Sequence, residues 1–528
     1  MRRGTRPAGL MNTAEDLFRR TLLVVLTSVL ASAVLIASFY STRWALAVGV
    51  GTIAMGITFL LAGNHRLFCL YAIMFIAPLS LASHFRQIIH MGGATSFTID
   101  GVDPLLGMLL VFLLRDLAHG RRRSLHLTSL APWVGGMIAL GMLDIAINPL
   151  RVLPAQEVLR MSKCFLLFFL LVNELVREKQ FMHALGALIA SMTLQSVLGI
   201  AQWVIKGSLG LQALGEADLV VIEAAATGAF VGGGLSDAFR SNALMGHPNL
   251  LSAYLAMLLP ICIALLFSRL PLLARIAIGG STLLGLASLM LTLSRSGWVS
   301  FGVAATLLFI LSFVHPRLQR RYLFARVTAI MLMVVVLVAF SGPIIRRIVD
   351  SDPGALNFRL EWNAIAWEMV KDEPLLGFGL NTWVYQLPGR TRFGGISGLT
   401  DMFGPTWPVV HNIYLLTWSE QGTLGFICFL GIHFSLLAAA IRNLKRYYND
   451  VLFAANLGAL CGVVALMVDG LASFYLRIQG SARVFWIVAA LIIAIDYWNR
   501  RNTPHRALPD TAAPTPPPGA AGTAERQS

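Results

Sequence analysis

Long apolar runs alternate with short polar segments along most of this 528-residue chain. The first run, TLLVVLTSVLASAVLIASFY at residues 21–40, carries no charge and is long enough to cross a bilayer, because a membrane helix needs about 20 apolar residues. Two later runs are short, so the pattern predicts an all-α polytopic membrane protein with 12 to 14 transmembrane helices. The later runs lie at 44–62, 67–83, 101–114, 129–147, 164–176, 181–203, 248–268, 274–294, 297–314, 327–345, 412–441, 451–469 and 483–499.

Composition supports a membrane protein, since 56% of the residues are hydrophobic and only 13% are charged. Ordinary globular domains carry about 25% charged residues. The net charge of +15 is unevenly spread, and the span pattern puts the basic clusters at 115–123, 317–326, 442–446 and 500–501 on one side. That side holds 25 of the 41 lysines and arginines. The positive-inside rule then predicts cytoplasmic termini in a bacterial inner membrane, and we expect no nucleic-acid partner.

This topology divides the chain into four regions. Residues 1–20 form a basic cytoplasmic N-terminus, residues 21–205 an N-terminal transmembrane bundle, and residues 206–499 a second membrane region. Residues 500–528 form a cytoplasmic tail rich in proline and alanine, which we expect to be disordered. The second membrane region contains two long polar segments, 206–248 and 342–411, on the periplasmic side. Long loops commonly carry binding or chemistry, so we expect the functional site there.

The five cysteines lie within or beside apolar runs, at Cys69, Cys164, Cys262, Cys428 and Cys461. No CxxC pair occurs, so the spacing indicates neither a disulfide framework nor a zinc site. We expect the cysteines to be packing residues.

The second periplasmic segment contains a predicted helix and a predicted turn. In FRLEWNAIAWEMV, residues 358–370, apolar side chains recur at helical spacing, which predicts an amphipathic helix lying on the membrane surface. Pro374 should end that helix. LLGFGLNTW, residues 375–383, has the glycines of a turn. No strand precedes its GxG, so it does not indicate a nucleotide-binding site.

Cationic and amide side chains collect near the outer ends of the spans. Arginine there can simply extend to lipid headgroups, and His411 can cap the helix that it precedes. Trp362 fits either the aromatic belt of a membrane interface or a platform for a sugar ring. Glu420, two turns inside the run 412–441, should face protein and hold a neighbouring loop rather than act in catalysis. The candidates for binding or catalysis are Arg240, His247, Asn249, Arg295, Arg359, Trp362, His411 and Asn412.

Four stretches resemble, in order and spacing, the bacterial O-antigen ligase and O-antigen polymerase superfamily. They are RSNALMGHPNLLSAYLAMLLP, LTLSRSGWVSFGVA, FRLEWNAIAWEMVKDEPLLGFGLNTW and HNIYLLTWSEQGTLGFICFLG, between residues 240 and 431. The N-terminal half agrees only in hydropathy. The resemblance implies a GT-C-like membrane glycosyltransferase whose large periplasmic loop contains short interfacial helices. Such an enzyme uses an undecaprenyl-diphosphate-linked glycan as donor, and the ligases need neither nucleotide nor metal, so we expect no cofactor.

The resemblance also implies roles for individual residues. The family's loop arginine falls on Arg240, and the arginine that opens the interfacial helix falls on Arg359. The histidine of the HN pair falls on His411, and the arginine of the SR pair on Arg295. Where the family often has Asn-Pro-Asn, this chain has HPN, which leaves open whether His247 adds a second acid–base group. The implied catalytic residues are Arg240, Arg359 and His411; the implied substrate-binding residues are His247, Asn249, Arg295, Trp362 and Asn412.

These residue types suit transfer from a lipid diphosphate. Arginine stays charged and offers a planar fork of donors to phosphate oxygens. A neutral imidazole can accept the proton of a sugar hydroxyl near pH 7. The acceptor is lipid A–core in the ligases, a second lipid-linked repeat unit in the polymerases and a protein hydroxyl in a related branch, and the motifs do not distinguish them. The rival from another class is a transporter of lipid-linked sugars, which would show charges within spans and broken helices.

Overall fold

The computed structural model describes residues 63–79, 82–88, 92–122, 125–217, 239–314, 353–387, 409–446 and 449–502, together with isolated positions between 327 and 345. The spans expected at 21–40 and 44–62, and the tail expected at 500–528 beyond Asn502, lie outside them. The predicted number of 12 to 14 transmembrane helices therefore stays a prediction.

Helices dominate the described part of the chain, which confirms a mostly helical, polytopic membrane fold. Seven of the described helices are long and apolar enough to cross a membrane: α7 (Glu178–Ile205), α9 (Pro248–Leu266), α10 (Leu272–Leu291), α11 (Arg295–Val314), α17 (Ile413–Lys445), α18 (Asp450–Asp469) and α19 (Gln479–Asn502). The others are α3 (His65–Ile76), α4 (Asp103–Ala118), α5 (Ala131–Ile147), α6 (Val152–Glu174), α14 (Pro353–Asp372), α15 (Trp383–Gln386) and the 3-10 turns η1 (Gln212–Leu214) and η3 (Tyr475–Arg477).

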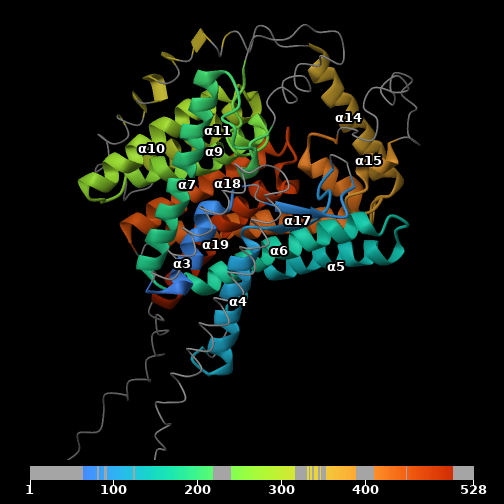
Figure 1. Ribbon diagram of the computed structural model, residues 1–528, viewed down its shortest axis with the longest axis horizontal. Coiled ribbons are helices and arrows are strands. Elements are labelled where there is room, and N and C mark those ends of the chain that lie inside the picture. Colours follow the sequence, from blue (N-terminus) through green and yellow to red (C-terminus); the bar gives the residue numbers. More distant parts are fainter. Residues whose placement is uncertain are drawn as a thin grey trace, which may run out of the picture.

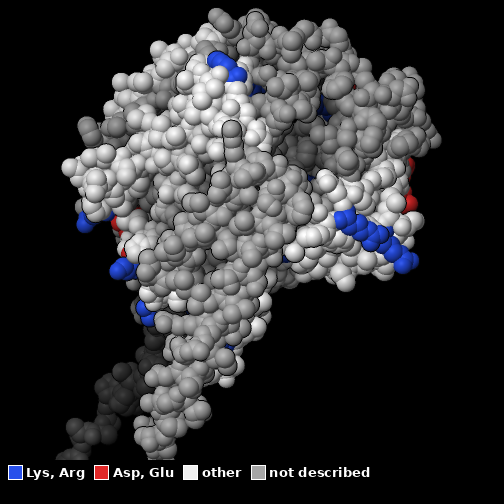
Figure 2. Space-filling model, in the orientation of Figure 1, with Lys and Arg blue, Asp and Glu red and all other residues white. Residues whose placement is uncertain are grey.

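Two groups of helices pack on either side of α17, α18 and α19 (Figure 1). The green group contains α7, α9, α10 and α11, of which α9 and α11 contact α18. The cyan group contains α5 and α6, which contact α17 and α19 respectively. Most of the described surface in Figure 2 is uncharged, and Lys and Arg side chains appear on it in only a few places. Such a surface suits contact with lipid, where isolated charges are costly.

Two glycines allow α18 to pack very closely against α9. A Cβ atom at Gly458 would lie 2.3 Å from the Cα atom of Ile261, and one at Gly462 would lie 2.1 Å from the carbonyl oxygen of Met257. Small residues four apart let membrane helices approach to backbone contact. Because the helices run antiparallel, this contact keeps the start of α9 beside the end of α18.

Two predicted spans are wrong in their boundaries. The run at 67–83 is helical only to Ile76; Ala82–Phe85 (β1) then pairs antiparallel with Phe97–Asp100 (β2), a small sheet that the sequence pattern did not indicate. The run at 164–176 is the second half of α6, which begins at Val152. The first half carries charged residues, so an apolar count excluded it.

The predicted amphipathic helix is present, but its apolar face packs on protein. α14 ends at Asp372, just before Pro374, as expected. Its side chains Trp362, Ile365, Ala366 and Met369 are at most 3% exposed, and the helix packs against α17. The prediction that this face lies on the membrane surface is therefore wrong, because α17 covers it.

All five cysteines are free, as the spacing predicted. Four are buried and Cys428 is half-buried. They lie on helices, where they serve packing.

α17 is interrupted at Gly422, whose φ of 61° and ψ of −168° are not helical. The turn predicted at 375–383 lies against this break, and Gly377 and Gly379 have φ of 73° and 107°. A Cβ atom at Gly422 would lie 2.2 Å from the carbonyl oxygen of Leu375. Only glycine therefore fits at Gly422, for reasons of both φ and space.

We expect Gly422→Ala to destabilise the protein by more than about 2 kcal/mol, because a side chain here combines left-handed strain with a backbone collision. Thermal unfolding of the purified protein in detergent measures the effect. The control is Gly302→Ala on α11, where a Cβ atom meets nothing within 4 Å. Equal melting temperatures for the two variants would contradict the account.

Candidate functional site

Several helix ends meet at one end of the bundle. α9 begins after His247, α11 begins at Arg295 and α17 begins after His411 and Asn412. α10 and α18 end there, at Leu291 and Asp469. The opposite end holds Arg442 and Arg500, which both pair with Asp496. This separation agrees with the expected sidedness, in which the basic clusters and the functional site lie on opposite faces, and the sidedness itself stays a prediction.

Arg240 is held by two hydrogen bonds that aim its guanidinium group. Its Nε atom donates to the carbonyl oxygen of Thr292 at 3.0 Å, and one terminal nitrogen donates to the Asn249 side chain at 2.8 Å. The following backbone is anchored to α7, because the side-chain oxygen of Gln202 accepts from the amides of Asn242 and Ala243. Arg240 is therefore a preorganised cation on a fixed segment.

His247 lies among positive charges. Its Nδ1 atom accepts a hydrogen bond from the Asn249 amide at 3.1 Å, which caps α9. Burial, together with the charges of Arg240, His411 and Arg359, lowers the pKa of His247 to about 3. The charges of all three side chains therefore act on the His247 ring.

Arg359, on α14, completes the cluster of cations. Burial lowers the pKa of Arg359, the neighbouring charge of Arg295 lowers it further, and the carboxylate of Asp469 raises it. Arg295 is exposed at the start of α11, whereas Arg359 is half-buried. The excess of guanidinium groups over carboxylates makes this end of the bundle suitable for an anion.

Asp469 is a member of the cluster that the sequence analysis missed. It is the last residue of α18, it is 1% exposed, and the hydroxyl groups of Ser296 and Ser473 lie beside its carboxylate. In the sequence Asp469 ends the apolar run 451–469, where a charged residue indicates only the end of a helix. A carboxylate at the outer end of a span, facing the same loops as the candidate arginines, was the available signal.

His411 has one ring nitrogen engaged with the backbone. Its Nδ1 atom lies 3.0 Å from the carbonyl oxygen of Val409, so Nδ1 carries the proton and Nε2 is the basic atom of the neutral ring. The ring meets Phe474 edge-on, with centroids 5.3 Å apart. Burial and the charge of Arg359 lower the pKa of His411 to about 4. The imidazole is therefore neutral at pH 7 and able to accept a proton.

The other candidates have structural positions. Asn412 caps α17, because its side-chain oxygen accepts from the amides of Tyr414 and Leu415. Asn249 accepts from Arg240, so it orients that residue. Trp362 is 2% exposed and packs against Trp383 in the core, which leaves it neither in an aromatic belt nor at the surface of the cluster. A ring buried in this way has no face open to a sugar.

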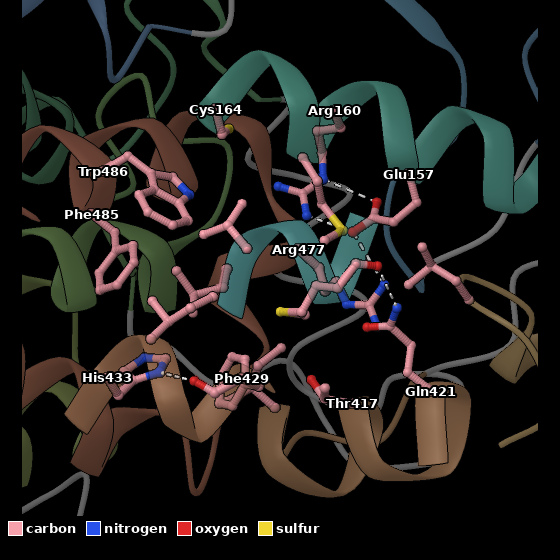
Figure 3. Close-up of a pocket in the computed structure, with 17 residues that line it drawn as sticks. Glu157, Arg160, Cys164, Thr417, Gln421, Phe429, His433, Arg477, Phe485 and Trp486 are labelled. Atoms are coloured by element: carbon pink, nitrogen blue, oxygen red, sulfur yellow. Dashed lines mark hydrogen bonds and ion pairs between the residues drawn. The ribbon is translucent and has the colours of Figure 1, made fainter. Parts of the chain in front are cut away.

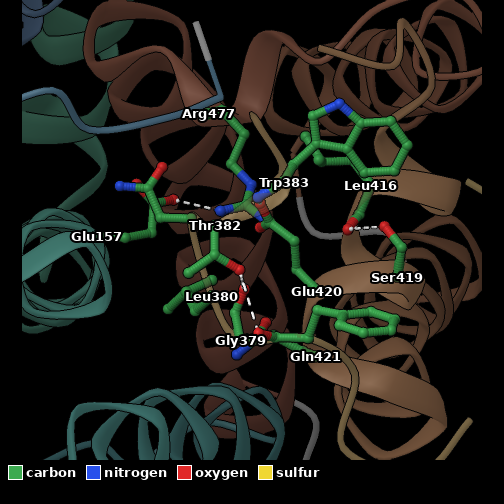
Figure 4. A network of polar contacts seen from close by, with 12 residues as sticks. Glu157, Gly379, Leu380, Thr382, Trp383, Leu416, Ser419, Glu420, Gln421 and Arg477 are labelled. Carbon is green, nitrogen blue, oxygen red and sulfur yellow. Dashed lines mark hydrogen bonds and ion pairs between the residues drawn. The ribbon is translucent and has the colours of Figure 1, made fainter. Parts of the chain in front are cut away.

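Glu420 holds a loop, as the sequence predicted. It is fully buried; one carboxylate oxygen accepts from the Trp383 amide at 3.1 Å, and the other pairs with Arg477. Figure 4 shows Arg477 between Glu420 and Glu157. Arg477 was not among the candidates predicted from the sequence. The sequence feature that could have indicated it is a charged residue just before the apolar run 483–499.

A small cavity lies beside these charges, between α6, α17 and α19 (Figure 3). Its volume is about 70 Å³, and Glu157, Arg160, Gln421, His433 and Trp486 are among its lining residues. One water needs roughly 10–15 Å³ of such space, so the cavity suits a few waters and is too small for a glycan.

Some buried charges and the broken α17 match features that we expected of a transporter. The charges are paired with one another: Glu157 with Arg160 and Arg477, and Asp100 with Lys163 and Arg483. Such fixed pairs link helices, so they do not distinguish a transporter from a glycosyltransferase. In the described part of the chain, no group of three or more His, Cys, Asp and Glu side chains could hold a metal ion.

Residues 280–430 match the family model described as O-antigen ligase. The match covers less than half of the chain, so it is this segment that is similar to the O-antigen ligase family. The matched residues include Arg295, Arg359 and His411, whereas Arg240 and His247 precede them. The chain has no match among curated proteins. The matched segment thus supplies three members of the cluster. The residues just before α9 supply Arg240 and His247, and the end of α18 supplies Asp469.

We expect Arg359→Gln to raise the pKa of His411, because the loss of a nearby positive charge favours the protonated ring. The pKa should stay below the ordinary value of about 6.5, since burial is the larger cause of the shift. Titration by nuclear magnetic resonance of histidine-labelled protein measures it, with His411→Ala identifying the signal. An unchanged pKa would place Arg359 too far from His411 for the proposed site.

Proposed function

We propose that this protein is a membrane glycosyltransferase that transfers a glycan from an undecaprenyl-diphosphate-linked donor to an acceptor hydroxyl at the periplasmic face. One observation carries the proposal: Arg240, Arg295, Arg359 and His411, from segments far apart in the sequence, converge at one end of the bundle. The match to the O-antigen ligase family supports the same reaction class.

The arginines would stabilise the leaving diphosphate. When the bond between the sugar and the diphosphate breaks, negative charge grows on the phosphate oxygens, and fixed guanidinium groups interact more strongly with that charge than with the intact donor. Arg240 and Arg359 would make the main contacts, and Arg295, at the exposed start of α11, would extend the site toward the water side. This assignment uses no metal ion and no nucleotide.

His411 would act as the general base. Its Nε2 atom accepts the proton of the acceptor hydroxyl, whose oxygen attacks the anomeric carbon while the diphosphate leaves. Burial and the charge of Arg359 hold the ring neutral. A bound diphosphate offsets the arginine charge and raises the pKa of His411, which strengthens the base when substrate is present.

The acceptor distinguishes two enzymes that would share this site. An O-antigen ligase transfers to lipid A–core, whereas a polymerase transfers to a second lipid-linked repeat unit. A transporter of lipid-linked sugars is the remaining alternative. It would have no use for a base whose Nε2 atom is oriented by a backbone contact at Nδ1.

We expect His411→Ala to lower transfer by at least about 100-fold, as loss of a general base usually does, while membrane insertion is unchanged. A purified assay with lipid-linked glycan in vesicles measures the rate. In cells carrying the variant, accumulation of full-length lipid-linked polymer indicates a ligase, and accumulation of single repeat units a polymerase. Near-wild-type transfer would remove His411 from the role of base.

We expect Arg240→Lys and Arg359→Lys each to reduce transfer at least tenfold, because an ammonium group cannot make the two parallel contacts of a guanidinium group. Initial rates at saturating acceptor measure the loss. The control is Arg275→Lys on α10, whose guanidinium group donates to the carbonyl oxygen of Ser268 at the other end of that helix. Full activity in both lysine variants would argue against the diphosphate clamp.

A further inference from the structure

The loop that follows α14 lies in the break of α17. We call residues 374–383, up to and including the first residue of α15, the α14–α15 loop. At the break, the Thr423 amide donates to the carbonyl oxygen of Pro374 at 2.8 Å. On its other side, the amides of Phe378 and Gly379 donate to the carbonyl oxygens of Ser419 and Glu420, at 3.0 and 2.9 Å. The loop therefore satisfies backbone groups that the interrupted helix leaves open, as membrane proteins require.

Four buried charges hold this arrangement from one side. Glu420 accepts from the Trp383 amide at the end of the loop and pairs with Arg477. Arg477 also pairs with Glu157 at 3.1 Å, and Glu157 pairs with Arg160 at 2.5 Å. Two carboxylates and two guanidinium groups give a neutral cluster, none more than 8% exposed (Figures 3 and 4).

Arg477 lies on a segment that contacts the start of α17. The Ile413 amide donates to the carbonyl oxygens of Gly470 and Ser473, at 2.9 and 3.0 Å. Phe474, three residues before Arg477, meets the ring of His411 edge-on. The position of Arg477 therefore bears on the position of the imidazole.

The same cluster also bears on Arg359. The α14–α15 loop directly continues α14, which carries Arg359, and Glu420 fixes the far end of that loop. One ion pair thus links the helix that holds a proposed phosphate-binding cation to the segment that packs on the proposed base.

We propose that Glu420 and Arg477 are positioning residues for glycan transfer, which set Arg359 and His411 at their working separation. This inference rests on the proposed function. A buried ion pair adds little net stability over a neutral pair, because desolvation offsets attraction. A role in geometry explains better why the pair connects two catalytic elements.

The proposal predicts which kinetic constant changes. Arg240 precedes α9 and Arg295 opens α11, helices that carry neither Glu420 nor Arg477, so we expect both arginines still to bind the donor when the pair is removed. Misplacement of the base and of Arg359 lowers the rate of the chemical step. We therefore expect a loss in kcat with little change in the donor KM.

The test variant is the double substitution Glu420→Gln/Arg477→Gln. It removes one charge of each sign, so the cluster stays neutral and Glu157 keeps its pair with Arg160. The matched control is Glu368→Gln/Lys371→Gln, which removes the ion pair of these two residues on α14, where both side chains are about half exposed. Exposed pairs contribute little, so the control should behave like the wild type.

Two measurements on purified protein decide the matter. We expect the test variant to lose at least tenfold in kcat, with less than a threefold change in donor KM. Hydrogen exchange read by mass spectrometry should show faster exchange of the loop amides, those of Phe378, Gly379 and Trp383, in the test variant only. A wild-type kcat overturns the proposal, and so does a reduced kcat with unchanged exchange of the loop.

A further variant covers the case in which the double variant does not fold. Arg477→Lys keeps the charge but cannot span both carboxylates, so we expect an intermediate loss of kcat, and full activity overturns the proposal. Failure of the proposed function has a different outcome. If His411→Ala transfers normally, the base assignment falls, whereas the exchange measurement still reports whether the pair holds the loop.

Discussion

Several positively charged side chains lie together at this end of the bundle, where burial removes much of their hydration. The rest of the site depends on this arrangement. Burial is the larger cause that keeps the imidazoles of His247 and His411 neutral; the charge of Arg359 adds to it at both rings, and that of Arg240 at His247. A rigid scaffold holds such a cluster together, and a bound anion would offset its charge. The proposed diphosphate donor is such an anion and makes the base stronger as it binds.

Two features hold these charges in place: close contacts between helices, and a helix break whose backbone groups are hydrogen-bonded by a neighbouring loop. Gly458 and Gly462 bring α18 against α9, which sets Asp469 beside the segment with His247. Gly422 interrupts α17, and the loop after α14 fills the gap with backbone hydrogen bonds. Irregular backbone is stable at this depth because protein surrounds it. Several segments that are distant in the sequence therefore fix the positions of the site residues together.

Part of the candidate site could be predicted from the sequence, because charged and amide side chains stand out at the ends of apolar runs. Arg240, His247, Arg295, Arg359 and His411 all emerged from that pattern, and the structure brings them together. Asp469 and Arg477 did not emerge, because each lies at the edge of an apolar run and resembles a helix end. The prediction that Trp362 lies at a membrane interface or under a sugar ring was wrong. Periodicity shows which face of a helix is apolar, but it does not show what covers that face.

The sequence by itself determined that the chain is a helical membrane protein, that α14 forms and stops before Pro374, and that a glycine turn follows. These properties depend on the length, period and composition of single segments, which are local. Only the tertiary structure decided that α14 packs on α17 rather than on lipid, that four buried charges cancel, and which lone pair of His411 is basic. Those outcomes depend on groups far apart in the chain, such as Glu157 and Arg477, whose proximity no local pattern contains.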